Sequence, residues 1–493
     1  MESSKDSSNL RQKAVKSVIW TAIESWGRQA VSLVVFFILA RLLSPETFGL
    51  IALAYIFIEF AQIFVDQGFS VAIIQRQDID KEHLDTAFWT TLGISIFLTI
   101  LSVACARFTA DFFKQPQLVL IIQWLSISFT FSGLSAVQQA ILERKFDFKS
   151  LAIRSLLAVI IGGIVGVGMA LLNFGVWSLV GQQLYSGFVQ VLVLWRVSDW
   201  RPGFRFSAIH AKELFKFGVN ISAFNIINFF NRNTDNFLIG YYLGLVALGY
   251  YSVAYKLMQV MMQILITTTT KVALPIFSRL QAEPERLLSA FYTATQFTSL
   301  IAFPIFLCVP VLATELIKVF LSEQWIQSIP VLQVLSLIGP AHVIFFYNNS
   351  VILALGKPSW RLWIQVINTV TNVVGFALVV KWGIVAVACA YVVRGYLILP
   401  ISLFAVNKLV KINLTNYLSL YIVPLVASGV MVGTILATKY FLGSFIEAWL
   451  LLAISLLLGI SIYIFTISVI SPKLFKRLLE LGESLNFKRK NKV

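Results

Sequence analysis

The chain has 493 residues, of which 58% are hydrophobic and 13% are charged, and its mean hydropathy is +0.83. Soluble domains are nearer half apolar and about a quarter charged, so this composition excludes an ordinary soluble protein and predicts a polytopic membrane protein. The formal net charge of +16 would also suit a nucleic-acid-binding protein, but the positions of the cations argue against that class.

Hydrophobic runs separated by short polar loops predict about fourteen transmembrane helices, because one helix needs roughly 20 apolar residues to cross a bilayer. The polar residues 1–16 precede the first run and do not resemble a cleavable signal peptide. The predicted spans are residues 17–43, 46–69, 85–110, 117–141, 150–172, 175–197, 213–241, 246–270, 288–313, 326–355, 359–380, 383–407, 417–440 and 445–470. Twelve or thirteen spans are the alternative, since Pro330 and Pro340 could break the segment 326–355.

The cations are distributed unevenly between the predicted loops. With the amino terminus in the cytoplasm, lysines and arginines of the cytoplasmic loops outnumber those of the outer loops by roughly five to one, as the positive-inside rule requires. The basicity therefore indicates topology, with both termini cytoplasmic, and attraction to anionic lipid rather than to nucleic acid. The cysteines and histidines show no ligand spacing, so we predict no metal site and no cofactor.

Two stretches of the chain resemble each other at a shift of 200 residues. LARLLSPETFGLIALAY (39–55) aligns with IGYYLGLVALGYYSVAY (239–255), which pairs Gly49 with Gly249, and a later shift of 208 pairs Gly175 with Gly383. A repeated unit of six spans keeps both halves in the same orientation, as in several transporter folds, and rocking of the halves about a cavity gives alternating access.

We therefore expect an all-α polytopic membrane protein with two pseudo-symmetric six-helix lobes and two C-terminal helices. The predicted parts are a cytoplasmic N-terminal segment (1–16), an N-lobe (17–197), a cytoplasmic inter-lobe loop (198–212), a C-lobe (213–407), two further helices (417–470) and a basic cytoplasmic tail (471–493).

The seventh predicted span carries polar residues inside an apolar segment, FNIINFFNRNTDNFLIGYY (224–242). At about 100° per residue, Asn225, Asn228, Arg232, Asp235 and Asn236 fall within an arc of roughly 140°. Charged groups within a membrane are costly, so we expect this face to line a cavity or to contact a partner. Arg232 and Asp235 can also pair with each other. Hydrogen bonds that merely hold helices together are the alternative explanation.

Other spans carry further ionisable groups. Glu24 and Arg28 lie four residues apart on the first span, and Arg28 could simply neutralise Glu24; Lys256 could instead reach the membrane interface. The residues predicted to line a cavity for an anionic substrate are Arg28, Asn225, Asn228, Arg232, Asn236, Lys256 and Arg394. The candidates for carrying a coupling proton or sodium ion are Glu24, Glu59, Asp66 and Asp235. The chain shows no catalytic motif, so we predict a transporter and not an enzyme.

Several segments resemble the polysaccharide-transporter branch of the MOP flippase superfamily, in particular the WzxC-like group of Wzx proteins. These segments are ARLLSPETFGLIALA (40–54), DQGFSVAIIQRQ (66–77), HLDTAFW (83–89) and NTDNFLIGYYLGLVALGYYSVAYKL (233–257). The resemblance covers nearly the whole chain and implies fourteen helices in two lobes plus two. It also implies a flippase of the bacterial inner membrane that moves undecaprenyl-pyrophosphate-linked oligosaccharides for lipopolysaccharide or exopolysaccharide assembly. The implied partners are this lipid-linked substrate, membrane lipids, H+ or Na+ as coupling ion, and a polysaccharide polymerase or export machinery.

Three other functions stay open at this point. An ion-coupled exporter of drugs or cations from the same superfamily would favour an acidic, aromatic cavity. A flippase of peptidoglycan lipid precursors would share the fold. A polytopic glycan polymerase would be expected to have a large outer loop, whereas the outer loops predicted here are short.

Overall fold

The structure, a computed structural model, describes residues 2–65, 69–75, 79–477 and 480. These residues are almost entirely helical, and none of them lies in a β-strand. The chain separates into two compact units, Met1–Ser252 and Val253–Val493, and one helix crosses the boundary between them. The predicted all-α architecture is confirmed, while the predicted lobe boundaries stay predictions.

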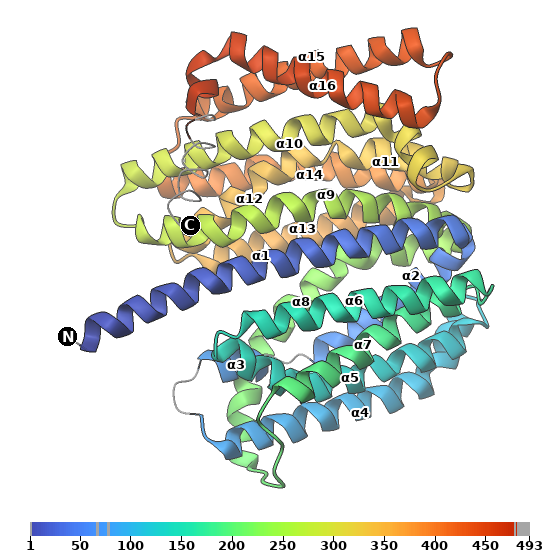
Figure 1. Ribbon diagram of the computed structural model, residues 1–493, viewed down its shortest axis with the longest axis vertical. Helices are drawn as coiled ribbons and strands as arrows, with labels where there is room; N and C mark the ends of the chain where they lie inside the picture. Colours follow the sequence, from blue (N-terminus) through green and yellow to red (C-terminus); the bar gives the residue numbers. More distant parts are fainter. Residues whose placement is uncertain (1, 66–68, 76–78, 478–479, 481–493) are drawn as a thin grey trace. The chain divides into compact units, whose positions relative to one another are not determined.

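The first unit is a bundle of helices that follow the predicted spans (Figure 1). Its helices are α1 (Glu2–Leu42), α2 (Pro45–Val65), α3 (Phe69–Gln75), α4 (Lys81–Phe112), α5 (Leu118–Arg144), α6 (Phe148–Leu171), α7 (Trp177–Val197), α8 (Ala208–Tyr242) and the start of α9 (Gly244–Arg279). The first helix is longer than expected, because residues 2–16 continue it. The span predicted at 46–69 ends at Val65, and α3 is a separate short helix.

The second unit contains the remaining helices and a broken span. Its elements are the rest of α9, α10 (Pro284–Phe320), η1 (Glu323–Ser328), α11 (Ile329–Ser336), α12 (Gly339–Ala354), α13 (Pro358–Val379), η2 (Val380–Trp382), α14 (Ile384–Val410), α15 (Leu414–Leu442) and α16 (Ala448–Ile470). The segment Glu323–Ser336 meets Gly339–Ala354 at a bend of 43°. Pro330 and Pro340 stand in the first turns of α11 and α12, where a missing N–H is tolerated, so the predicted break is confirmed.

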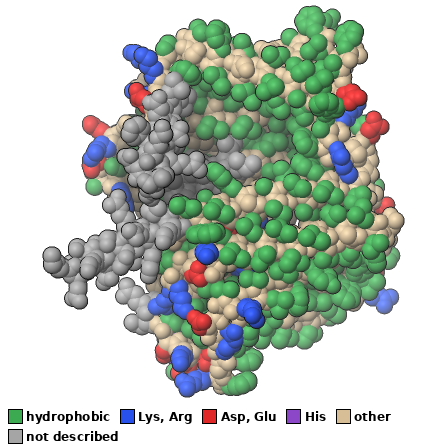
Figure 2. Space-filling model, in the orientation of Figure 1, with side chains coloured by type: hydrophobic (Ala, Val, Ile, Leu, Met, Phe, Trp, Pro, Cys, Tyr) green, Lys and Arg blue, Asp and Glu red, His purple; other side chains and the backbone are tan. Residues whose placement is uncertain are grey.

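The helices have the length and composition of membrane spans. Ten of the described helices are long and apolar enough to cross a membrane, or eleven if the bent pair forms one span. Hydrophobic side chains cover wide areas of the visible face (Figure 2), and large side chains such as Trp363, Leu397 and Leu457 are mostly exposed. A surface of this kind suits contact with lipid. The protein is therefore a multi-pass membrane protein.

Two stretches related by the shift of 200 residues make a reciprocal contact within the first unit. A Cβ atom at Gly49 would lie 1.9 Å from the carbonyl oxygen of Leu245, and one at Gly249 would lie 1.9 Å from that of Pro45. Pro45 and Leu245 are separated by the same 200 residues as the two glycines, so each copy makes the contact that its counterpart makes. The first turns of α2 and α9 thus pack backbone against backbone, which only glycine allows.

Candidate functional site

A chamber of about 540 Å³ lies within the first unit, between α2, α3, α5, α7 and α8. Its lining amides are Gln62, Gln139, Gln183, Gln190 and Asn225, and its lining hydroxyls are Ser70, Ser128, Ser132, Ser135 and Ser186. Phe131, Ala136 and Gly187 complete the wall, and no described lining residue is ionisable. The volume falls in the range of about 300–1,000 Å³ that is typical of small-molecule sites.

Helical periodicity brings these polar groups together. On α5 the lining residues recur every three or four positions from Ser128 to Gln139, and on α7 they do so from Gln183 to Gln190. Residues at this spacing share one face of a helix. The sequence analysis concentrated on charged residues and missed these stripes, although the Ser- and Gln-rich stretch SISFTFSGLSAVQQA (126–140) contains the signal.

A buried arginine supports one wall of the chamber from behind. Arg154 on α6 is 7% exposed; its Nη1 donates to Gln139 Oε1 over 2.8 Å and its Nη2 donates to Ser155 Oγ over 3.2 Å. Gln139 Nε2 in turn donates to Glu143 Oε1 over 2.8 Å, and Ser155 Oγ donates to Glu24 Oε1 over 2.6 Å. Among the described residues Arg154 makes no ion pair. Neutral groups therefore separate its guanidinium from the two carboxylates.

The loop between α7 and α8 is fixed to the start of α4 by the HLDTAFW segment. We call residues 198–207 the strap. Gly203 is held twice, because its N–H donates to Asp85 Oδ1 over 2.9 Å and its carbonyl accepts from Trp89 Nε1 over 2.7 Å. The N–H of Ser207 donates to Thr86 Oγ1 over 3.1 Å. HLDTAFW is one of the segments that resemble the flippase family. In the structure its residues Asp85, Thr86 and Trp89 hold the strap by hydrogen bonds.

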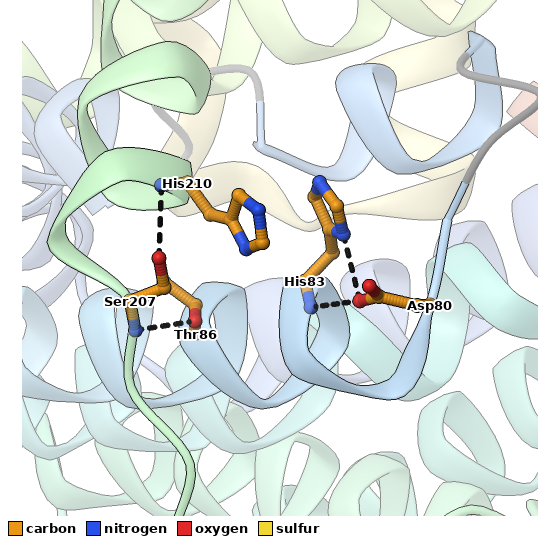
Figure 3. A network of polar contacts seen from close by, with 5 residues as sticks. All are labelled: Asp80, His83, Thr86, Ser207 and His210. Carbon is orange, nitrogen blue, oxygen red and sulfur yellow. Dashed lines mark hydrogen bonds and ion pairs between the residues drawn. The ribbon is translucent and has the colours of Figure 1, made fainter.

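Two histidines join the first turns of α4 and α8 beside the strap (Figure 3). The rings of His83 and His210 stack with centroids 3.7 Å apart. Asp80 caps α4 by accepting from the backbone N–H of His83 over 2.8 Å, and its Oδ1 also contacts His83 Nδ1 at 2.7 Å. The backbone hydrogen bond, followed by the side-chain contact, holds the pKa of Asp80 below its ordinary value. The stacked rings bring the first turn of α8 against that of α4.

The predicted cavity residues of α8 have different surroundings. Asn225 lines the chamber, whereas Asn228 and Asn236 are half-buried and Arg232 is exposed. Among the described residues, Arg232 and Asp235 do not form the ion pair that the sequence suggested. Asp235 is buried and accepts hydrogen bonds from the Tyr251 hydroxyl and the Asn236 N–H, each over 2.8 Å.

The other predicted residues of the first unit lie at several places. Glu24 contacts Ser155 as described, and Arg28 is exposed and makes no ion pair among the described residues, so it does not neutralise Glu24 by direct contact. Glu59 on α2 accepts from Asn233 Nδ2 over 3.1 Å. Asp66 lies outside the described residues. Which carboxylate carries a coupling ion stays a prediction.

The second unit has a smaller pocket of about 140 Å³ around Arg394. Its polar lining residues are His342, Asn349, Gln365, Asn368 and Arg394. The guanidinium contacts Asn368 Oδ1 and lies 5.0 Å above the ring of Tyr391. Lys256 belongs to this unit and is exposed on α9. A planar cation with several amides suits an oxyanion, because guanidinium groups bind phosphate with two parallel hydrogen bonds.

The sequence matches a family model described as polysaccharide biosynthesis protein over residues 38–330. The teichuronic acid biosynthesis protein TuaB of Bacillus subtilis is 25% identical over 482 residues, covering 96% of this chain and 99% of TuaB. The succinoglycan biosynthesis transport protein ExoT of Rhizobium meliloti is 28% identical, covering 65% of each chain. The lipopolysaccharide biosynthesis protein WzxC of Escherichia coli is 27% identical, covering 67% of this chain and 68% of WzxC.

Solved structures show the same fold. The inward closed conformation of the lipid II flippase MurJ superposes with a TM-score of 0.74 at 16% sequence identity, covering 93% of this chain and 99% of MurJ. At this level of identity the likeness concerns the arrangement of helices alone.

Proposed function

Because the chain belongs to the polysaccharide biosynthesis protein family and is a Wzx-like polysaccharide transporter, we propose that it flips an oligosaccharide linked to undecaprenyl pyrophosphate across the bacterial inner membrane. The product would serve the assembly of a lipopolysaccharide or an exopolysaccharide. The names of TuaB, ExoT and WzxC support a polysaccharide pathway. The observation that carries the proposal is the uncharged polar chamber inside a bundle of apolar helices.

A sugar is the ligand that such a chamber fits best. Polar groups buried in an apolar environment cost free energy unless they are hydrogen-bonded. Each sugar hydroxyl both donates and accepts, as do the amides and hydroxyls of the wall. The pocket around Arg394, taken by itself, offers a cation that suits an oxyanion such as a pyrophosphate group. We assign a sugar of the glycan to the chamber.

Transport would follow alternating access between an N-lobe (17–197) and a C-lobe (213–407). In this proposal α7, α8 and α9 also span the membrane, which gives fourteen spans with both termini in the cytoplasm. The cavity residues named from the sequence, together with the chamber, would line the route. An ion gradient would drive the cycle through Glu24, Glu59, Asp66 or Asp235, and a polysaccharide polymerase would receive the flipped unit.

A flipping assay with purified protein tests this proposal. The full chain is reconstituted in liposomes with a fluorescent polyprenyl-pyrophosphate disaccharide, and the fraction of probe exposed on the outer leaflet is followed over time. Wild-type protein should flip the probe, and Gln183→Leu should slow flipping by roughly tenfold, since a wall hydrogen bond to the sugar is lost.

The matched control is the neighbouring residue on the same helix. Gln182 packs against Gly166 on α6 and does not line the chamber, so Gln182→Leu should flip at close to the wild-type rate. Absence of flipping by the wild-type protein would overturn the proposed function, and equal rates for the two variants would remove the chamber from it.

A further inference from the structure

The described residues of the chamber wall are uncharged, although the chain as a whole carries a net charge of +16. An acidic sugar that entered the chamber would lose water around its carboxylate without gaining a cation. A charge transferred in this way is penalised far more than a hydroxyl, which can replace each lost water with a neutral donor or acceptor. The wall therefore discriminates between sugars by their charge.

The cation behind the wall does not change this conclusion. Arg154 is 7% exposed and does not line the chamber; its Nη1 donates to Gln139 and its Nη2 donates to Ser155. It reaches the chamber only through the Gln139 amide. An amide has two N–H groups and two acceptor lone pairs, so the bonds to Arg154 and Glu143 leave one of each for a ligand.

We propose that the chamber selects an uncharged sugar residue of the lipid-linked glycan, and that Gln139 is a specificity-determining contact whose orientation is set by Arg154 and Glu143. The inference rests on the proposed function. The C6 hydroxyl of a neutral hexose both donates and accepts and so matches the remaining donor and acceptor of the Gln139 amide, whereas the C6 carboxylate of a uronic acid offers acceptors only.

A binding measurement in nanodiscs separates the two sugar classes. The probes are two polyprenyl-pyrophosphate disaccharides that differ only in the terminal sugar, glucose in one and glucuronic acid in the other. The wild-type protein should bind the glucose probe at least about tenfold more tightly. Gln190→Lys should reduce or reverse this preference by supplying a cation, while Gln123→Lys, on α5 but outside the chamber, should preserve it.

Neighbouring glutamines of α5 give a second matched pair. Gln139→Leu should weaken binding of the glucose probe by about tenfold. Gln138 is fully buried, and its amide atoms have no hydrogen-bond partner among the described residues, so Gln138→Leu should leave binding unchanged. Arg154→Met should weaken binding as Gln139→Leu does and should add nothing in the double variant, which a merely structural role of Arg154 would not produce.

The possible results are distinguishable. Equal or tighter binding of the glucuronic acid probe by the wild-type protein would overturn the inference while the proposed function stood. Equal affinities of Gln139→Leu and Gln138→Leu would overturn the role of Gln139. If neither probe bound or was flipped, the proposed function would be overturned and this inference with it.

Discussion

The first unit holds a chamber of about 540 Å³ with amide and hydroxyl walls, whereas the second holds a pocket of about 140 Å³ with an arginine in its wall. Each unit also contains a buried or half-buried arginine at its site. In the first unit Arg154 lies behind the wall, where its Nη1 donates to Gln139 and its Nη2 donates to Ser155. In the second, Arg394 lies in the wall itself, between Asn368 and Tyr391.

The difference shows that the position of a charge matters more than its presence. A guanidinium behind a wall orients an amide and offers a ligand no direct hydrogen bond, while a guanidinium in the wall can contact an anion directly. Counting arginines in membrane spans therefore overestimates the number of anion contacts. Four experiments test the two sites and the contacts that stabilise the first unit.

Removal of the cation from the second pocket should have the largest effect. Arg394→Gln should slow flipping of the pyrophosphate-linked probe by roughly 10- to 100-fold, because a hydrogen bond to a charged group contributes about 1.5–3 kcal/mol. Arg394→Lys should flip the probe at a rate between those of the wild type and Arg394→Gln, since lysine keeps the charge and loses the bidentate geometry. Wild-type flipping by Arg394→Gln would remove the pocket from the transport route.

Filling the chamber should have a somewhat smaller effect. Ser132→Phe places a phenyl ring among the wall amides and should slow flipping by about tenfold through loss of space and of sugar contacts. Binding of inorganic pyrophosphate, measured by calorimetry, should stay at the wild-type level, because the probe has no sugar. Loss of both flipping and pyrophosphate binding in Ser132→Phe would contradict the assignment of the sugar to the chamber.

Loosening the strap should destabilise the first unit. Asp85 is buried and accepts the Gly203 N–H, so Asp85→Ala should lower the free energy of unfolding by about 1–3 kcal/mol. Trp89→Phe removes one hydrogen-bond donor and keeps an aromatic ring, so it should lower the free energy of unfolding by only about 1 kcal/mol. Thermal unfolding of the purified protein measures both. The strap assignment would be wrong if Asp85→Ala melted like the wild type.

Substitution of Asp80, the residue that caps α4, should have the smallest effect on stability, and this effect should depend on pH. The pKa of Asp80 is lowered on folding, chiefly by the His83 N–H, so its stabilisation is present above the ordinary Asp pKa of about 3.9 and is lost as the pH falls through the lower folded value. Asp80→Asn should therefore melt below the wild type at pH 7, and the difference should shrink below about pH 4. A difference that was constant down to pH 3 would contradict this account.

The positions of the helices could be predicted from the sequence alone. Every predicted span corresponds to a helix or to the bent pair at Pro330 and Pro340, because a bilayer demands long apolar segments and proline limits helix continuity. The pairing of Gly49 with Gly249 anticipated a contact that only glycines permit. The family also followed from short motifs, and the family model confirmed it.

The contacts between polar groups of different helices could not be predicted from the sequence. Gln139 and Arg154 belong to different helices, and Gly203 reaches Asp85 across 118 residues. The rotation of each helix about its axis and the packing of its neighbours determine such encounters, and local periodicity does not encode them. For the same reason the sequence presented Asp235 as the partner of Arg232, although the fold gives its carboxylate to Tyr251.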